Sequence, residues 1–273
     1  MRKTFSVMLA FVLVLCGTFY CYGQVTVRAN KEESVYARGG TPIDVKTDII
    51  SYSYTNEDEY VFPDKIPGYI SNYTCGITAG GVIVGYYDRS YEDLIPNHTG
   101  SYLLGKWRWG TQGTEVNNMF SSLYTLMGAT SSGVTVPGYK SGMTSYVASK
   151  GQTMSFTDVK ATSGALNPAY KTALKAGKPL TIFLNGFNIV SFNGYLSYTD
   201  SGKYDKIVNE IYSGLHVMAV YGYLEVKYFN ASNINFQTET FLYVCTGYTT
   251  NALAWLRLSA YCAIDDCYIS HIS

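Results

Sequence analysis

Histidine and charge are both scarce in this chain. Its 273 residues contain three histidines, twenty basic and twenty acidic residues, so the formal net charge is zero. A balanced charge offers no basic face to a phosphate backbone, and we therefore expect no nucleic-acid partner. Histidine is the side chain best suited to proton transfer near neutral pH. Such chemistry has three candidates: His98, His216 and His271.

The apolar run at the N-terminus is too short for a membrane-spanning helix. Residues 1–23 read "MRKTFSVMLAFVLVLCGTFYCYG", a short basic start followed by an apolar centre and small residues. A spanning helix needs about 20 apolar residues, and this centre is shorter. The pattern is typical of a secretory signal peptide. We expect a secreted, extracellular or cell-envelope protein with no stable membrane insertion after the signal is removed.

Few cysteines follow that segment. The four are Cys75, far upstream, and Cys245, Cys262 and Cys267 near the C-terminus. In an oxidising compartment this spacing favours at most one C-terminal disulfide and leaves Cys75 free. Cys262, Cys267 and His271 could each donate to zinc, but their spacing is not a familiar zinc pattern. We expect core thiols or a local disulfide, and neither a metal nor a cofactor.

The composition predicts one main domain after a polar segment. Hydrophobic residues make up 47% of the chain, which is typical of a globular protein. Residues 24–63 are polar and irregular, with "ARGGTP" as a flexible break and "NEDEY" as an acidic cluster. They have little helical periodicity and are interpreted as an extended arm, linker or pro-segment. Residues 64–273 then form the compact domain.

Helix signals lie in the first part of the domain and strand signals in the second. Apolar side chains recur on one helical face over residues 115–128, and residues 167–179 combine an N-cap with Gly and Pro terminators. Residues 179–185 and 215–229 have strand composition, and residues 238–248 are a predicted antiparallel partner. This order predicts the α+β class.

The segment "YTCGITAGGVIVGYYDR", residues 73–89, places a cysteine before very small residues. If residues 76–87 form a helix, its N-terminal N–H groups and dipole stabilise a thiolate at Cys75, and a thiolate is the nucleophilic form. The small residues would let other segments approach the helix closely. The alternative is that Cys75 is a small buried side chain.

His216 is the histidine best placed to act as a base. It follows the predicted turn "YSGL" at the start of a strand, whereas His98 lies in the polar turn "IPNHTG" and His271 lies near the C-terminus. His216 follows Cys75 by about 140 residues, within the ~130–150 that separate nucleophile and histidine in papain-like enzymes.

Three motifs resemble those of the C39-like cysteine peptidases, a branch of the papain-like superfamily. They are "YTCGITAGGVIVGYYDRSYEDLIP" around the nucleophile, "GLHVMAVYGY" around the histidine and "FLYVCTGY" in the following strand. The resemblance covers residues 66–269. It implies a papain-like fold, in which a helical first half carrying Cys75 packs on an antiparallel sheet carrying His216. It also implies hydrolysis of a peptide or protein substrate by this dyad.

The chain departs from the family pattern at two supporting positions. Cys245 stands where the family has Asp or Asn to orient the histidine, and a thiol is a weak acceptor. Thr246, Asn251 or a backbone carbonyl are the candidates for this third member. The family's oxyanion glutamine is also absent, and Asn72 is the candidate to replace it, although it equally fits a plain turn.

Two functional hypotheses follow from the resemblance. The first is an active secreted peptidase. Because related peptidases cut after paired glycines, Gly39-Gly40 raises the further hypothesis that the arm is self-processed, with a flexible turn as the alternative. The second is a weakened or inactive C39-like domain that serves as an extracellular peptide- or glycan-binding module, because the orienting Asp or Asn is missing.

Overall fold

The computed structural model describes residues 35–36, 41–51, 53–62, 66–109, 112–161, 165–190, 204–230, 232–248, 252–259 and 262–273. The predicted signal peptide lies outside these residues. Lys31–Ser273 forms one compact unit. Within the described part of the chain, no helix has the length and apolarity needed to cross a membrane.

Four helices occur in the described residues: α1 Cys75–Asp88, α2 Thr114–Leu126, α3 Val136–Ser149 and α4 Ala169–Lys175. The helix predicted over residues 115–128 is confirmed as α2. Its apolar side chains are buried except Leu126, which is 42% exposed. The helix predicted after residue 167 is confirmed as α4, where the Asn167 side chain accepts from the Ala169 N–H at 3.0 Å. Gly177, at φ 73°, follows its end.

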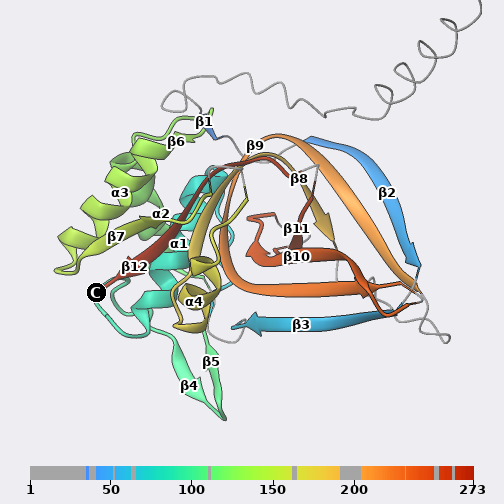
Figure 1. The fold of residues 1–273 in the computed structure, drawn as a ribbon. Coiled ribbons are helices and arrows are strands. Elements are labelled where there is room, and N and C mark those ends of the chain that lie inside the picture. The colour runs from blue at the N-terminus through green and yellow to red at the C-terminus, as the bar shows by residue number, and fades with distance from the viewer. Residues whose placement is uncertain are drawn as a thin grey trace, which may run out of the picture. The chain divides into compact units, whose positions relative to one another are not determined.

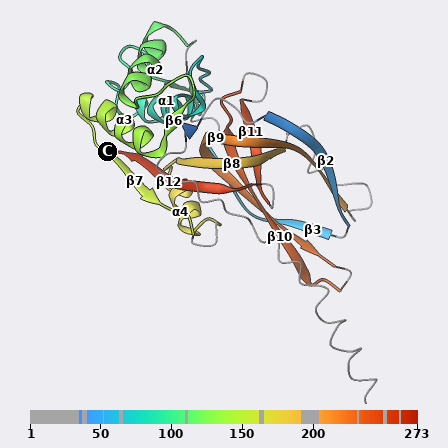
Figure 2. The same cartoon turned by 90° about the horizontal axis from the view of Figure 1, so that it is seen from above.

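The strands confirm the α+β class, because most belong to one antiparallel eight-stranded sheet with the order β2-β9-β10-β11-β8-β12-β7, and β3 pairs with β9. Figures 1 and 2 show α1, α2 and α3 grouped at one end of this sheet. The strands are β1 Val35–Tyr36, β2 Thr41–Ser51, β3 Ser53–Val61, β4 Ser101–Leu103, β5 Lys106–Arg108, β6 Val134–Thr135, β7 Met154–Asp158, β8 Leu180–Val190, β9 Tyr204–Phe229, β10 Asn235–Cys245, β11 Leu253–Leu258 and β12 Ile264–Ile272.

Strand β9 has 26 residues and pairs with β2, β3, β8 and β10. Since β11 also joins β10 to β8, strands β8, β9, β10 and β11 form a closed hydrogen-bonded circuit. The circuit supplies all the buried members of a small apolar cluster separate from the main core: Val190, Ile207, Leu224, Val226, Tyr228, Phe241 and Trp255.

A buried polar network accompanies this cluster. Arg257 donates to both carboxylate oxygens of Glu239, at 3.0 and 2.8 Å. Its third contact is the Asn209 side-chain oxygen at 3.0 Å, which also accepts from Asn188 at 2.9 Å. The four residues are at most 7% exposed. Each charge is therefore paired and hydrogen-bonded, as burial requires.

The turn predicted at "YSGL", residues 212–215, is wrong. These residues continue β9, and the pairing of β8 with β9 shifts between Asn185 and Phe187. Gly214 has a φ of 99° beside this irregularity, so the glycine signals a β-bulge and not a chain reversal. His216 consequently lies in the middle of a long strand.

The described residues of the predicted arm form extended strands. β2 pairs with the first part of β9, and β3 pairs with its last part. Residues 41–51 and 53–61 thus belong to the same sheet as the rest of the domain. That residues 24–63 are a linker or a cleaved pro-segment stays a prediction.

Candidate functional site

Cys75 is the first residue of α1, and the predicted helix is confirmed. Thr74 precedes it in an extended conformation, and the Ile77 and Thr78 N–H groups donate to the Thr74 carbonyl at 3.1 and 3.2 Å. The first turn contains no acidic residue. The positive end of the helix dipole therefore reaches Cys75 without a competing carboxylate; this field favours a thiolate, whereas burial of the side chain opposes it.

The small residues of α1 allow close packing around Cys75. A β-carbon on Gly76 would collide with Val134 Cγ1 of β6, and one on Gly81 would collide with the Phe120 ring of α2. All 14 residues of the helix are buried, and Cys75 is 3% exposed. The glycines accept side chains from β6 and α2, while the helix also contacts β9.

His216 is held by the main chain of the neighbouring strand end. Its side chain is 1% exposed, and its Nε2 lies 2.8 Å from the Thr246 carbonyl oxygen. A carbonyl only accepts, so Nε2 carries the hydrogen in this contact. The buried Nδ1 has no hydrogen-bond partner among the described residues. In the neutral ring, Nδ1 is therefore the atom that can accept a proton.

Two aromatic rings stack on the His216 imidazole. Phe187 stacks at 5.1 Å and 21°, and Tyr248 stacks at 5.1 Å and 4°. Burial lowers the pKa of His216 to about 4, against the opposing effect of the Thr246 carbonyl. The imidazole is neutral at pH 7, the form a general base requires.

The residue after the His216 anchor lies beside the first turn of α1. Gly247, which follows Thr246, lies near Thr78: a β-carbon added to Gly247 would be in ordinary van der Waals contact with the Thr78 side chain, at 3.5 Å. Thr78 is three residues after Cys75 on the helix. The end of β10 therefore links the predicted nucleophile's helix to the predicted base.

The residues that the sequence suggested as the third catalytic residue differ in their position relative to His216. Thr246 offers its main-chain carbonyl to His216, while its side-chain oxygen accepts from the Tyr248 N–H at 3.0 Å. Cys245 is buried, and the hydrogen bond that His216 makes goes to the Thr246 carbonyl and not to the Cys245 thiol. Asn251 lies outside the described residues.

Asn72, the oxyanion candidate, is exposed in the bend that precedes α1. The other two histidines contact the opposite half of this helix or its neighbours. His271 Nδ1 lies 3.1 Å from the Tyr87 hydroxyl. The His98 ring lies 5.8 Å from that of Tyr69, which packs on Gly85. Of the three histidines, His216 is the one anchored next to the first turn of α1.

Sequence reasoning missed the two rings that flank His216. Tyr248 ends the motif "FLYVCTGY" and lies two residues after Thr246, so the motif could have predicted that this tyrosine lies near His216. No motif could have predicted the contact of Phe187, because this residue belongs to β8 and reaches His216 only through the pairing of β8 with β9.

None of the four described cysteines forms a disulfide, so the local disulfide that the sequence left open does not occur among them. Cys75, Cys245 and Cys267 are buried core thiols, and Cys262 is partly exposed. Burial raises the pKa of Cys262 to about 12, and the pKa of Cys267 is raised further by burial and nearby acidic groups. Among the described residues, no group of three His, Cys, Asp or Glu side chains is arranged to hold a metal ion.

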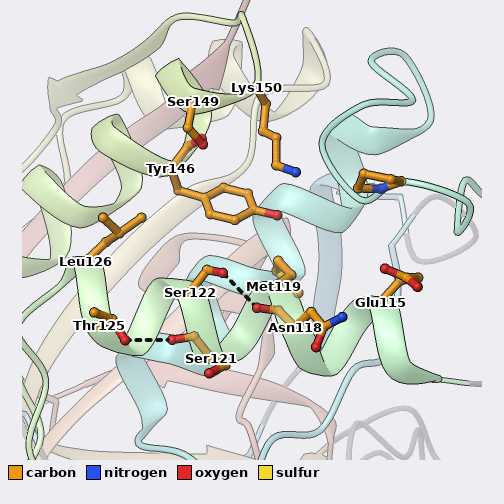
Figure 3. Close-up of a pocket in the computed structure, with 11 residues that line it drawn as sticks. Glu115, Asn118, Met119, Ser121, Ser122, Thr125, Leu126, Tyr146, Ser149 and Lys150 are labelled. Atoms are coloured by element: carbon orange, nitrogen blue, oxygen red, sulfur yellow. Dashed lines mark hydrogen bonds between the residues drawn. The ribbon is translucent and has the colours of Figure 1, made fainter.

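A separate polar groove of about 530 Å³ lies between α2 and α3 (Figure 3). Glu115 and Lys150 stand at its edges, and its hydroxyls are engaged locally: Ser122 donates to the Asn118 carbonyl at 2.9 Å. Neither Cys75 nor His216 lines it.

The thiol at the start of α1 and the anchored imidazole therefore form the candidate active site. Cys75 belongs to the main core and His216 is buried, and both residues belong to the motifs that suggested them. A search with the whole chain finds no matching protein-family model, curated protein or solved structure.

Proposed function

We propose that this chain is a secreted, papain-like (C39-like) cysteine peptidase that hydrolyses peptide bonds through Cys75 and His216. The observation that carries the proposal is the state of His216: Nε2 is anchored on the Thr246 carbonyl, and the buried Nδ1 remains available as an acceptor. A cysteine at a helix N-terminus supplies the matching nucleophile.

The proposed reaction follows from these roles. His216 Nδ1 takes the proton of the Cys75 thiol, and the thiolate attacks the peptide carbonyl carbon. The Cys75 N–H, in the first turn of α1, needs no intrahelical acceptor and can donate to the oxyanion, with Asn72 as a second donor. The His216 proton then passes to the leaving amine, and water hydrolyses the thioester.

A second candidate is a weakened or inactive domain of the same family that binds a peptide or glycan outside the cell. Two observations favour it. Cys75 and His216 are only 3% and 1% exposed, and no carboxylate or amide side chain among the described residues is hydrogen-bonded to His216. A binding module would need neither access to the thiol nor a strong base.

Alkylation of Cys75 by iodoacetamide, followed by mass spectrometry across pH, tests the dyad. For the peptidase we expect rapid labelling below neutral pH that is slowed in His216→Ala, and cleavage of a peptide library that is abolished in Cys75→Ser. Cys262, whose pKa is about 12, is the internal control thiol. Labelling of Cys75 no faster than a free thiol of pKa ~8.5, without cleavage, would favour the binding module.

A further inference from the structure

The hairpin made of β4 and β5 projects away from the rest of the compact unit (Figure 1). Its base is fixed to the last part of α1, where the Trp109 indole Nε1 donates to the Gly85 carbonyl at 3.3 Å. The Arg89 guanidinium carbon also lies 5.7 Å from the centre of the Trp107 ring. At about 1.5 Å per helical residue, Gly85 lies about 15 Å along the helix from Cys75. The hairpin is therefore a feature separate from the candidate active site.

The tip of this hairpin exposes three consecutive large apolar side chains. Tyr102 and Leu103 are each more than half exposed, and Leu104 is 86% exposed. No other large hydrophobic side chain among the described residues is exposed to so great a fraction as Leu104. Apolar side chains gathered on an exposed surface are typical of a site that binds a protein or a membrane.

The turn at the tip does not itself favour a leucine. Leu104 and Gly105 form the two-residue loop between the paired residues Leu103 and Lys106, and their φ angles are 52° and 79°. Two positive φ angles are typical of a type I′ turn, for which Asn-Gly is a preferred pair. A leucine is disfavoured in this left-handed region because its β-carbon crowds the following carbonyl oxygen. Neither solvation nor turn geometry explains the leucine, which favours a role in binding.

The side chains of the hairpin change along its length in the order found across a membrane interface. Behind the two leucines of the tip, Tyr102 pairs with Trp107, and Arg108 lies one pair further from the tip. Tyr and Trp rings favour the headgroup level of a bilayer, and Arg and Lys are attracted to anionic lipids. Strands rise about 3.4 Å per residue, so the turn and Arg108 are about 10 Å apart, similar to the roughly 5–10 Å that interfacial segments penetrate.

We propose that the β4–β5 hairpin docks the protein on an anionic lipid bilayer. Leu103 and Leu104 enter the boundary between headgroups and acyl chains, and the two cations of β5 lie at the lipid phosphates. Charge complementarity supports a lipid partner, because residues 99–109 contain Lys106, Arg108 and no acidic residue. A projecting tip also suits a fluid bilayer, whereas a protein partner would need a pocket of matching shape. This docking is peripheral and does not depend on the proposed peptidase activity.

Sedimentation of the full chain with lipid vesicles measures the docking. The vesicles contain phosphatidylcholine alone or phosphatidylcholine mixed with the anionic lipid phosphatidylglycerol. Leu104→Asn creates the pair that the turn prefers, so the melting temperature should not fall, whereas binding to anionic vesicles should fall about tenfold or more. Ile234→Asn is the matched control, because it removes a side chain that is 60% exposed in the turn between β9 and β10, and it should leave binding unchanged. Lys106→Gln combined with Arg108→Gln should reduce binding to anionic vesicles to the level on neutral ones.

Quenching of tryptophan fluorescence by brominated lipids decides whether the hairpin itself enters the bilayer. The full chain should be quenched on anionic vesicles, and Trp107→Phe should lose most of this quenching, because Trp255 is buried. Leu104→Asn should lose it as well, while Ile234→Asn should keep it. Quenching that is absent from the full chain, or equal in these two asparagine variants, would overturn the inference. A dimer that forms without vesicles and dissociates in Leu104→Asn, measured by light scattering, would assign the tip to a second copy of the chain instead.

Discussion

The His216 Nε2 lies 2.8 Å from the carbonyl oxygen of Thr246, so a main-chain group, and not a carboxylate or amide side chain, is the hydrogen-bond partner of this ring nitrogen. Because a carbonyl can only accept, this contact selects the tautomer with hydrogen on Nε2 and leaves Nδ1 basic. A main-chain acceptor also makes the arrangement independent of the side chain at position 246.

Substitution of Thr246 separates the main-chain role from a side-chain role. Thr246→Ala keeps the carbonyl and loses only the hydrogen bond from the Tyr248 N–H. We expect Cys75 alkylation at pH 6 to stay within about threefold of the unmodified chain. Loss of an orienting side chain would instead cost on the order of 10–100-fold. Such a loss, measured by mass spectrometry, would transfer the orienting role to the hydroxyl.

Removing one of the stacked rings should raise the pKa of His216. Tyr248→Ala admits water to one face of the imidazole and weakens the desolvation that lowers the pKa to about 4. NMR titration should then find a pKa nearer the ordinary 6.5. Tyr248→Phe retains the stacked ring and should titrate like the unmodified chain. An equal shift in both variants would assign the effect to the hydroxyl.

His216 should also make the fold less stable in acid. Between pH 6.5 and about pH 4 the unfolded chain binds a proton on His216 that the folded chain does not, so stability falls as the pH falls through this window. The full loss amounts to about 3 kcal/mol. The His216→Phe variant should not show this loss of stability when urea unfolding is measured from pH 7 to pH 4.

Asp88 has the opposite effect on the pH dependence of stability. Burial raises its pKa to about 6, so the folded chain binds this proton first and gains stability as the pH falls. Both chains in the His216→Phe comparison retain Asp88, so the difference between their curves isolates His216. Parallel curves would mean that His216 is protonated in the folded protein.

The packing of α1 on α2 depends on the missing side chain at Gly81. Gly81→Ala would push against the buried Phe120 ring, at a cost of about 1–3 kcal/mol, which a helix-propensity gain of about 1 kcal/mol only partly offsets. In a Phe120→Leu background the added methyl should be tolerated better. A double-mutant cycle by urea unfolding should give a coupling of about 1 kcal/mol, and additive effects would contradict the contact.

Glu239 should be much more important for stability than an exposed carboxylate. Glu239→Ala leaves Arg257 buried without its counter-charge, which costs about 3–5 kcal/mol. Glu239→Leu combined with Arg257→Met removes both charges and should recover most of this loss. Glu92→Ala, at an exposed site, is the control and should change the free energy of unfolding by about 0.5 kcal/mol or less.

Local patterns in the sequence were sufficient for several elements. The apolar face of residues 115–128 predicted α2, and the Asn167 cap predicted α4. The run from residue 215 to 229 is confirmed as strand, with β10 as its antiparallel partner. These predictions succeeded because hydrophobic periodicity and helix capping depend on residues that are close together in the chain.

The same local reasoning failed where pairing partners lie far apart. The sequence predicts a turn at Gly214, but the positive φ of this glycine belongs to a β-bulge that only the pairing of β8 with β9 reveals. The polar segment before residue 63 carried no sign that β2 and β3 join the sheet. Long-range partners outweigh local strand propensity in such segments.

The sequence by itself determined the α+β class, the helix that begins at Cys75 and the choice of His216 as the candidate base, because spacing and residue type are local properties. Only the tertiary structure decided how that base is held. The Thr246 carbonyl and the Phe187 and Tyr248 rings come from segments that meet through strand pairing and core packing. A main-chain acceptor has no residue-type signature, so no motif could have predicted it.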